Sequence, residues 1–203
     1  YKLGGRPYLP LGTVTVQETK APQGYEIDPT VYVCHFTPDE SGRKWISFDM
    51  TATIPQEQVM GGVGIRKVDA EDDTASPRGA ASLDGATFAI YNASEHDVTV
   101  DGAVYTPQTL EDVQAGTAQA IMTIEAHDGA ATTDTDGDGA DASLPFGTYY
   151  LREVASGNGY LLDDTVRTVE VREAGAVAWC EDACANQVIR GDVAFDKVYE
   201  DTK

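Results

Sequence analysis

The sequence predicts an all-β protein, a β-sandwich that occurs in tandem repeats. Short apolar segments alternate with polar residues, and the 203-residue chain has 20 Gly and 9 Pro, which is typical of short strands with frequent turns. No long segment has the period of an amphipathic helix. A frame that starts with Gly-Thr and ends with Glu occurs at 12–18 and again at 147–153, and Gly-Tyr follows each copy.

The spacing of this repeat sets the expected domain boundaries. The two frames end at Glu18 and Glu153, and matching Gln-Val pairs begin at Gln58 and Gln187, at a similar interval. One repeat therefore takes about 130 residues. Three parts are expected in the chain: the C-terminal half of a preceding repeat at 1–62, a complete domain at 63–190 and the first strand of a following repeat at 191–203.

The alternation of apolar and polar residues predicts the strands of the complete domain in order. They are expected at 63–68, 85–92, 98–106, 117–125, 147–153 and 165–172, with two more between 176 and 189. Asp101-Gly102 is a hairpin signal inside the third of them. The first and last strands of a sandwich can be neighbours, so residues near the two ends of the domain are expected to meet.

Three polar side chains of this domain are expected to point into its core. Residues two apart in a strand share a face, and Lys67, Glu153 and Asn186 share theirs with apolar residues. Those apolar residues are Val63, Ile65, Tyr149, Leu151, Cys184 and Val188. A buried polar group without a partner costs roughly 2 to 7 kcal/mol, so the three are expected to engage one another. An amine, an acid and a carboxamide in a dry interior can condense to an isopeptide bond and release ammonia.

Several motifs resemble one family of bacterial surface domains. The frame at 147–153 with its Gly-Tyr looks like the E-box of the SpaA-like, Cna protein B-type domains of Gram-positive bacteria. Residues 83–91 resemble the second-strand signature of that family, and 190–197 resemble the junction that opens a next domain. The resemblance covers essentially all of 63–190. It implies an immunoglobulin-like, prealbumin-like sandwich that stacks into pili or adhesin stalks.

The resemblance also implies roles for the three inward residues. Many such domains form an autocatalytic Lys–Asn bond assisted by the E-box Glu, which by position means Lys67, Asn186 and Glu153. Burial disfavours charge on the amine and the acid. We expect the neutral amine to attack the amide carbon while the protonated acid hydrogen-bonds the Asn186 carbonyl oxygen. The reaction needs no cofactor and occurs once per molecule, so a turnover enzyme is not expected.

The upstream half-repeat is expected to lack this bond. The Gln-Val alignment puts Glu57 in the place of Asn186, and residues 1–62 contain no Asn. The incomplete sandwich would also expose strand edges.

A second lysine repeats the pattern of Lys67 near the end of the chain. Val193-Ala-Phe195-Asp-Lys197 has the same alternation, so Lys197 is expected to be the reactive lysine of a following domain. One hypothesis is that a strand at 193–199 completes the half-domain of another molecule.

The composition restricts the partners. Asp and Glu total 34 against 14 Lys and Arg, for a formal charge of -20, which repels nucleic acids and anionic membranes. No apolar run approaches the length of a signal or membrane segment. The chain begins at Tyr1, and we interpret it as a piece of a longer protein that is extracellular and held at the cell wall by parts outside this sequence.

Two further groups invite other chemistry. A disulfide between Cys180 and Cys184 fits an extracellular setting, and a reduced pair is the alternative. Asp134, Asp136 and Asp138 match the opening of a calcium loop, but Pro145 stands where the twelfth-place acid belongs. We therefore predict no metal site and a solvated acidic turn.

The preferred function is a structural stalk whose partners are neighbouring repeats of the same surface protein. The alternative is an adhesin module that binds a host protein or glycan through loops at 70–82 and 126–142. A thioester between Cys34 and Gln119 is disfavoured, because the two residues belong to different repeats.

Overall fold

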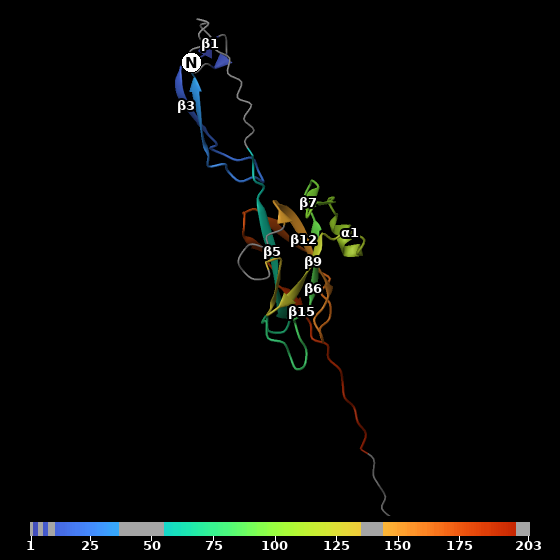
Figure 1. The fold of residues 1–203 in the computed structure, drawn as a ribbon. Helices are drawn as coiled ribbons and strands as arrows, with labels where there is room; N and C mark the ends of the chain where they lie inside the picture. The colour runs from blue at the N-terminus through green and yellow to red at the C-terminus, as the bar shows by residue number, and fades with distance from the viewer. Residues whose placement is uncertain (1, 4–5, 8–10, 37–54, 135–143, 198–203) are drawn as a thin grey trace, which may run out of the picture. The chain divides into compact units, whose positions relative to one another are not determined.

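The computed structural model describes residues 2–3, 6–7, 11–36, 55–134 and 144–197. The chain divides into two compact units, Tyr1–Val59 and Met60–Lys203, which we describe separately as unit 1 and unit 2. Figure 1 shows the strands of both units, coloured in chain order from blue to red.

Unit 1 has two antiparallel strand pairs among its described residues. Strand β1 (Lys2–Leu3) pairs with β2 (Arg6–Pro7), and β3 (Gly12–Gln17) pairs with β4 (Val31–Phe36). An antiparallel bridge joins Tyr25 to Gln58. Apolar side chains of the longer pair stay open to solvent, and Val16 is 44% exposed.

Unit 2 is a β-sandwich with a short helix, α1 (Leu110–Ala115). Its strands are β5 (Met60–Asp69), β6 (Thr87–Asn92), β7 (Val98–Val100), β8 (Ala103–Tyr105), β9 (Met122–His127), β10 (Ala130–Thr132), β11 (Leu144–Pro145), β12 (Gly147–Ala155), β13 (Arg167–Val171), β14 (Val177–Trp179) and β15 (Cys184–Asn186).

The strands of unit 2 form two layers. One layer has the antiparallel order β9-β6-β12-β13. In the other, β5 pairs antiparallel with β10 and β11 and parallel with β14 and β15, and the β9–β10 hairpin connects the layers. The core lies between them and contains the fully buried Val63, Ile65, Phe88, Ile90, Tyr149 and Leu151.

The predicted contact between the first and last strands of the domain is present. Strand β15 lies parallel to β5, with Cys184 opposite Lys67 and Asn186 opposite Asp69. The hairpin at Asp101-Gly102 is also confirmed, because β7 pairs with β8 and both turn residues have positive φ, 50° and 79°.

The predicted strand at 117–125 is wrong in its first half, because it begins only at Met122. Helix α1 and its connection precede it. The Thr109 side chain accepts a hydrogen bond from the Asp112 N–H, and Gly116 ends the helix at a φ of 74°. Thr109 three residues before Asp112 is a signal for the start of a helix, and Gly116 is a signal for its end. The prediction of a strand from 117 onward followed the alternation of apolar residues and missed these signals.

The predicted loop at 126–142 is partly strand. Strand β9 continues to His127, a turn at Asp128-Gly129 reverses the chain, and β10 then pairs with β5. Because residues 126–127 and 130–132 are paired in strands, fewer residues of this segment are left to form a binding loop. Residues 135–142 of that loop lie outside the described part of the chain.

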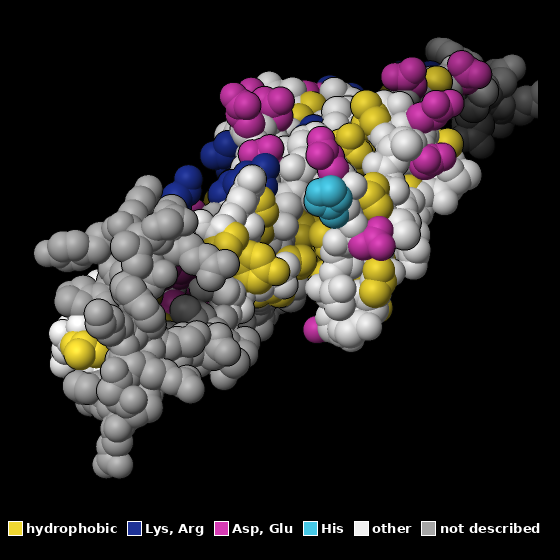
Figure 2. Space-filling view, turned by 90° about the horizontal axis from the view of Figure 1, so that it is seen from above, with side chains coloured by type: hydrophobic (Ala, Val, Ile, Leu, Met, Phe, Trp, Pro, Cys, Tyr) yellow, Lys and Arg dark blue, Asp and Glu magenta, His cyan; other side chains and the backbone are white. Residues whose placement is uncertain are grey.

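Acidic side chains are spread over the visible face of the described surface (Figure 2). Among the described residues, no helix combines the length and the apolar character that crossing a membrane requires.

Candidate functional site

Three strands bring the predicted site residues together in the core of unit 2. Lys67 comes from β5, Glu153 from β12 and Asn186 from β15. All three side chains are buried, with exposed fractions of 0%, 0% and 1%. A register shift between Glu153 and Ala155 on β12 follows the acid directly. Such bulges change the direction of a strand next to a site.

The Glu153 carboxyl group is the centre of the cluster. The Lys67 Nζ atom lies 3.4 Å from Glu153 Oε1. The Asn186 amide nitrogen lies 2.9 Å from Oε1 and 2.8 Å from Oε2. The backbone N–H of Asp163 donates to Oε2 at 2.7 Å. These partners are all donors, so the acid accepts hydrogen bonds from each side of the cluster.

The orientation of the Asn186 amide differs from the expectation. We expected the carbonyl oxygen of Asn186 to face Glu153, whereas the structure directs the amide nitrogen there. A carboxylate accepts but does not donate, and the nitrogen is the end of the amide that satisfies it. The Asn186 Oδ1 atom lies 3.2 Å from Cys184 Sγ instead.

Cys184 is a further member of the cluster; from the sequence, it was considered only as one half of a possible Cys180–Cys184 disulfide. Burial raises the pKa of its thiol to about 12, although the Lys67 charge acts in the opposite direction. The thiol therefore keeps its proton at neutral pH and can donate to Asn186 Oδ1. Lys67 Nζ also lies 3.4 Å from the Cys184 carbonyl oxygen and 3.5 Å from its sulfur. The sequence did contain a signal for this role: Cys184 is two residues before Asn186, so the two side chains lie on the same face of the strand.

The loop after β12 holds the acid in place. Asp163, whose N–H binds Glu153, forms an ion pair with Arg167 at 2.7 Å, and Arg167 also donates to the Ala183 carbonyl just before β15. Burial would raise the pKa of Asp163, but hydrogen bonds from Thr165 and Arg167 outweigh it and lower the pKa. Arg167 thus connects the loop that contains Asp163 to the chain just before β15, the strand that carries Asn186.

A second buried acid, Asp69, lies at the end of β5 outside the predicted set. It accepts hydrogen bonds from the Glu71 N–H at 2.8 Å, from the Tyr160 hydroxyl at 2.8 Å and from Arg78 at 3.3 Å. The Glu71 N–H is the main cause that lowers the pKa of Asp69, and Tyr160 and Arg78 add to it against the effect of burial. Its partners come from loops, which strand periodicity does not reveal.

The remaining predicted groups have different environments. Cys180 and Cys184 are both free, buried thiols in the structure. Asp134 is 8% exposed, so the prediction of a solvated turn is wrong at this residue, while Asp136 and Asp138 lie outside the described residues. The described residues include no cluster of three or more His, Cys, Asp or Glu side chains that could hold a metal ion.

The fold and the cluster together define the class of protein: a two-layer β-sandwich whose core contains an amine, an acid and a carboxamide. Residues 61–182 match the SpaA family, described as a prealbumin-like fold domain. The match takes in more than half of the chain, and the chain belongs to this family. No curated protein sequence matches it.

Solved structures resemble the chain at low sequence identity. The Bacillus anthracis TIE protein has a TM-score of 0.55 and 22% identity, over 89% of this chain and 26% of that one. The group B streptococcus pilus 2b backbone protein has a TM-score of 0.39 and 21% identity, over 78% and 56%. GBS52, the minor pilin of Streptococcus agalactiae, has a TM-score of 0.39 and 15% identity, over 93% and 65%. The chain spans less than two thirds of the length of each, and the likeness to the TIE protein shows the fold.

Proposed function

We propose that the chain is a structural stalk segment of a Gram-positive cell-surface adhesin or pilus protein. It acts outside the cell and joins neighbouring repeats or subunits rather than turning over a substrate. An isopeptide bond between Lys67 and Asn186, promoted by Glu153, stabilises unit 2. Membership of the SpaA family supports the structural role.

One observation carries the proposed bond: Glu153 contacts both the Lys67 amine and the Asn186 amide in a cluster closed to water. If Lys67 and Glu153 were both charged in this cluster, each would lose its hydration free energy. Their mutual attraction offsets that loss only when the geometry is good. Transfer of one proton from Lys67 to Glu153 removes both charges. The same transfer exposes the lone pair of the amine, which is then a nucleophile.

The condensation balances without a cofactor. The Lys67 nitrogen forms a bond to the side-chain carbonyl carbon of Asn186, and the bond from that carbon to Nδ2 breaks. Glu153 takes a proton from the lysine nitrogen and gives one to Nδ2, which leaves as ammonia. Because Nδ2 already donates to both carboxyl oxygens, the proton needs to travel only one hydrogen bond. The thiol of Cys184 faces the carbonyl oxygen, where negative charge develops.

The position of the bond suits a mechanical role. Strands β5 and β15 are parallel neighbours, and they lie near the two ends of the folded domain in sequence. A covalent link between them closes a loop of roughly 100 residues or more, and closing a loop of that size stabilises by roughly 4 to 5 kcal/mol in the chain-entropy treatment. Force applied through the two ends of the domain would then pass through the link instead of peeling the strands apart.

Intact-mass measurement tests the proposal. The purified chain is expected to weigh one ammonia less than its sequence, and a tandem spectrum of a digest is expected to contain a peptide branched at Lys67 and Asn186. Glu153→Gln should retain the full mass and melt at lower temperature, because the proton relay is lost. Glu170→Gln, at a 57% exposed side chain, is the matched control and should be cross-linked. A full sequence mass for the unaltered chain would contradict the proposal.

A further inference from the structure

The two oxygens of the Glu153 carboxyl group have different partners. The Lys67 Nζ atom lies 3.4 Å from Oε1, whereas the Asp163 N–H donates to Oε2 at 2.7 Å. The Asn186 amide nitrogen lies 2.9 Å from Oε1 and 2.8 Å from Oε2. Oε1 therefore contacts both reacting groups, and the backbone N–H holds Oε2.

A turn at residues 163–167 presents this N–H to the acid. The Asp163 carboxylate accepts hydrogen bonds from the Thr165 N–H at 3.0 Å and from the Arg167 guanidinium at 2.7 Å. The Arg167 side chain is only 12% exposed. Hydrogen bonds between charged groups are stronger than neutral ones, so the pair of Arg167 with Asp163 is the main contact that keeps the turn closed.

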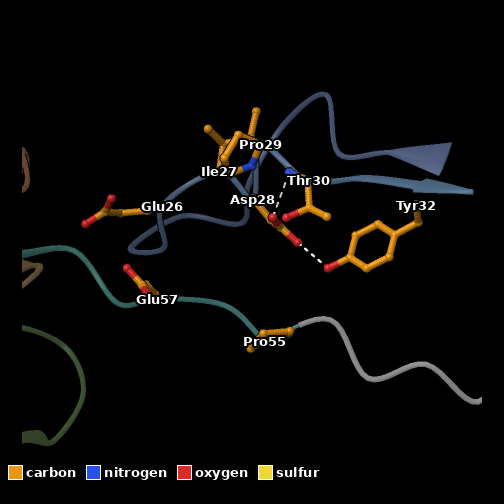
Figure 3. Close-up of a pocket in the computed structure, with 8 residues that line it drawn as sticks. All are labelled: Glu26, Ile27, Asp28, Pro29, Thr30, Tyr32, Pro55 and Glu57. Atoms are coloured by element: carbon orange, nitrogen blue, oxygen red, sulfur yellow. Dashed lines mark hydrogen bonds between the residues drawn. The ribbon is translucent and has the colours of Figure 1, made fainter.

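The same turn occurs in unit 1, at residues 28–32. The Asp28 N–H donates to Glu18 at 2.7 Å. The Asp28 carboxylate accepts from the Thr30 N–H at 2.9 Å and from the Tyr32 hydroxyl at 2.5 Å (Figure 3). These residues have the spacing of the turn in unit 2. A backbone N–H that holds the acid is thus a property of the turn, and the side chain that closes it can be Tyr or Arg.

Arg167 makes a contact in unit 2 besides closing the turn. Its guanidinium group donates to the Ala183 carbonyl oxygen at 2.9 Å. Ala183 directly precedes β15, and Asn186 is the last residue of that strand. Arg167 therefore couples the position of the acid to the position of the amide. A misplacement of about 1 Å in a reacting group can cost about 100-fold in rate, so this coupling matters for the reaction.

We propose that Asp163 and Arg167 are positioning residues of the cross-linking reaction, and that Glu153 Oε1 is the oxygen that transfers the proton. The inference rests on the proposed isopeptide bond. Oε1 takes a proton from the Lys67 nitrogen and gives one to Asn186 Nδ2, which leaves as ammonia when the new nitrogen–carbon bond has formed. Oε2 stays bound to the Asp163 N–H, so the carboxyl group does not rotate away from the amine.

The rate of ammonia loss after refolding, followed by intact mass, tests the inference. Arg167→Leu should slow cross-linking by about tenfold or more, because the acid and the amide lose their common support. Arg167→Lys should recover part of the rate, since an ammonium group can still pair with Asp163. Asp163→Asn keeps the backbone N–H but loses the ion pair, and it should also be slow. The double variant should be no slower than Arg167→Leu, because both changes act through one contact.

A variant that is destabilised elsewhere in unit 2 is the matched control. Val113→Ala removes volume from a separate core cluster that includes α1. It should unfold at a lower urea concentration and still cross-link at the normal rate. The inference is overturned if Arg167→Leu cross-links as fast as the unaltered chain, or if Val113→Ala slows the reaction equally.

Hydrogen exchange at the Asp163 amide, measured by NMR, reports on the contact with Oε2 when no bond can form. A chain with Lys67→Met keeps Glu153 but has no amine to react. Adding Arg167→Leu to it should raise the exchange rate at this amide by about tenfold or more, whereas adding Val113→Ala should not; equal protection in the two would overturn the inference. A full sequence mass for the unaltered chain would contradict the proposed bond instead, so the two failures are distinguishable.

Discussion

At the scale of single residues, burial decides the chemistry of unit 2. Lys67, Glu153 and Asn186 are fully or almost fully buried polar side chains that pack against the aliphatic and aromatic residues of the core. Each would destabilise the fold if it stood alone, and each is satisfied by the others. The same packing that makes the cluster compatible with folding also brings the amine, the acid and the amide into contact.

Cys184 is expected to speed cross-linking without being essential to it. Its S–H donates to Asn186 Oδ1, and removal of one donor to a developing oxyanion costs up to about 100-fold to 1000-fold in rate where the donor is a strong one. A thiol is a weak donor, so Cys184→Ala should slow bond formation by a smaller factor. Cys184→Ser should restore much of the rate. The time course of ammonia loss after refolding, followed by intact mass, measures this. An unchanged rate in Cys184→Ala would exclude the role.

Asp69 is expected to make stability depend on acid pH. Its pKa in the folded state is lowered below the usual 3.8, so its carboxylate stabilises the fold above about that pH, and the stabilisation is lost as the pH falls through the folded-state pKa. Asp69→Asn should therefore lower the melting temperature at pH 7, and the difference from the unaltered chain should shrink below pH 3.8. Asp73→Asn, at an exposed position, is the control. A difference that is constant with pH would contradict this account.

At the scale of elements, the E-box strand works together with the loop that follows it. In both units a Gly-Tyr dipeptide follows the acid, and Gly24 and Gly159 have φ of 83° and 82°, a region that glycine adopts without strain. The loop then returns a backbone N–H to the carboxyl group. The strand aims the acid inward, and the loop fixes its position.

Gly157→Ala is expected to disrupt this loop in unit 2. A Cβ atom at Gly157 would lie 2.1 Å from the Ser82 carbonyl oxygen and 3.0 Å from Leu83 Cα, and backbone atoms cannot move aside as a side chain can. Overpacking of this kind costs roughly 1 to 3 kcal/mol, which urea denaturation should detect. Gly191→Ala meets no atom within 4 Å and should be neutral. Equal stability of the two variants would show that the close approach is not maintained in solution.

At the scale of the whole molecule, the chain consists of two compact units. Unit 2 has a two-layer core and a full set of three interacting groups. In unit 1, Glu18 directly follows β3, and the Gln56 amide nitrogen donates to its carboxyl group.

Residues 60–190 produced alone are expected to fold and to lose one ammonia. The core, the three reacting groups and the loop that orients them all lie within this range, and the bond needs nothing from unit 1. Circular dichroism melting and intact mass are the measurements. The melting temperature should match that of unit 2 within the full chain. A fragment that folds but keeps its full sequence mass would show that unit 1 contributes to the reaction.

The sequence by itself determined the fold class, the core faces of the strands and the three inward polar residues. Period-two alternation is local information, and it showed that Lys67, Glu153 and Asn186 share faces with apolar residues. The repeated frame put Glu18 at the position that Glu153 has in the second copy.

The tertiary structure alone decided which residues meet across strands. The register between segments far apart in the chain determines the parallel pairing of β5 with β15, the contact of Cys184 with the amide and the cluster around Asp69. In unit 1, the Gln-Val alignment put Glu57 in the place of Asn186, but the Gln56 amide nitrogen is the one that lies 3.2 Å from both carboxyl oxygens of Glu18. The alignment was wrong by one residue, and a shift of one residue along a strand reverses its faces. Packing of the two layers fixes that register, because only one choice buries the apolar face of each strand.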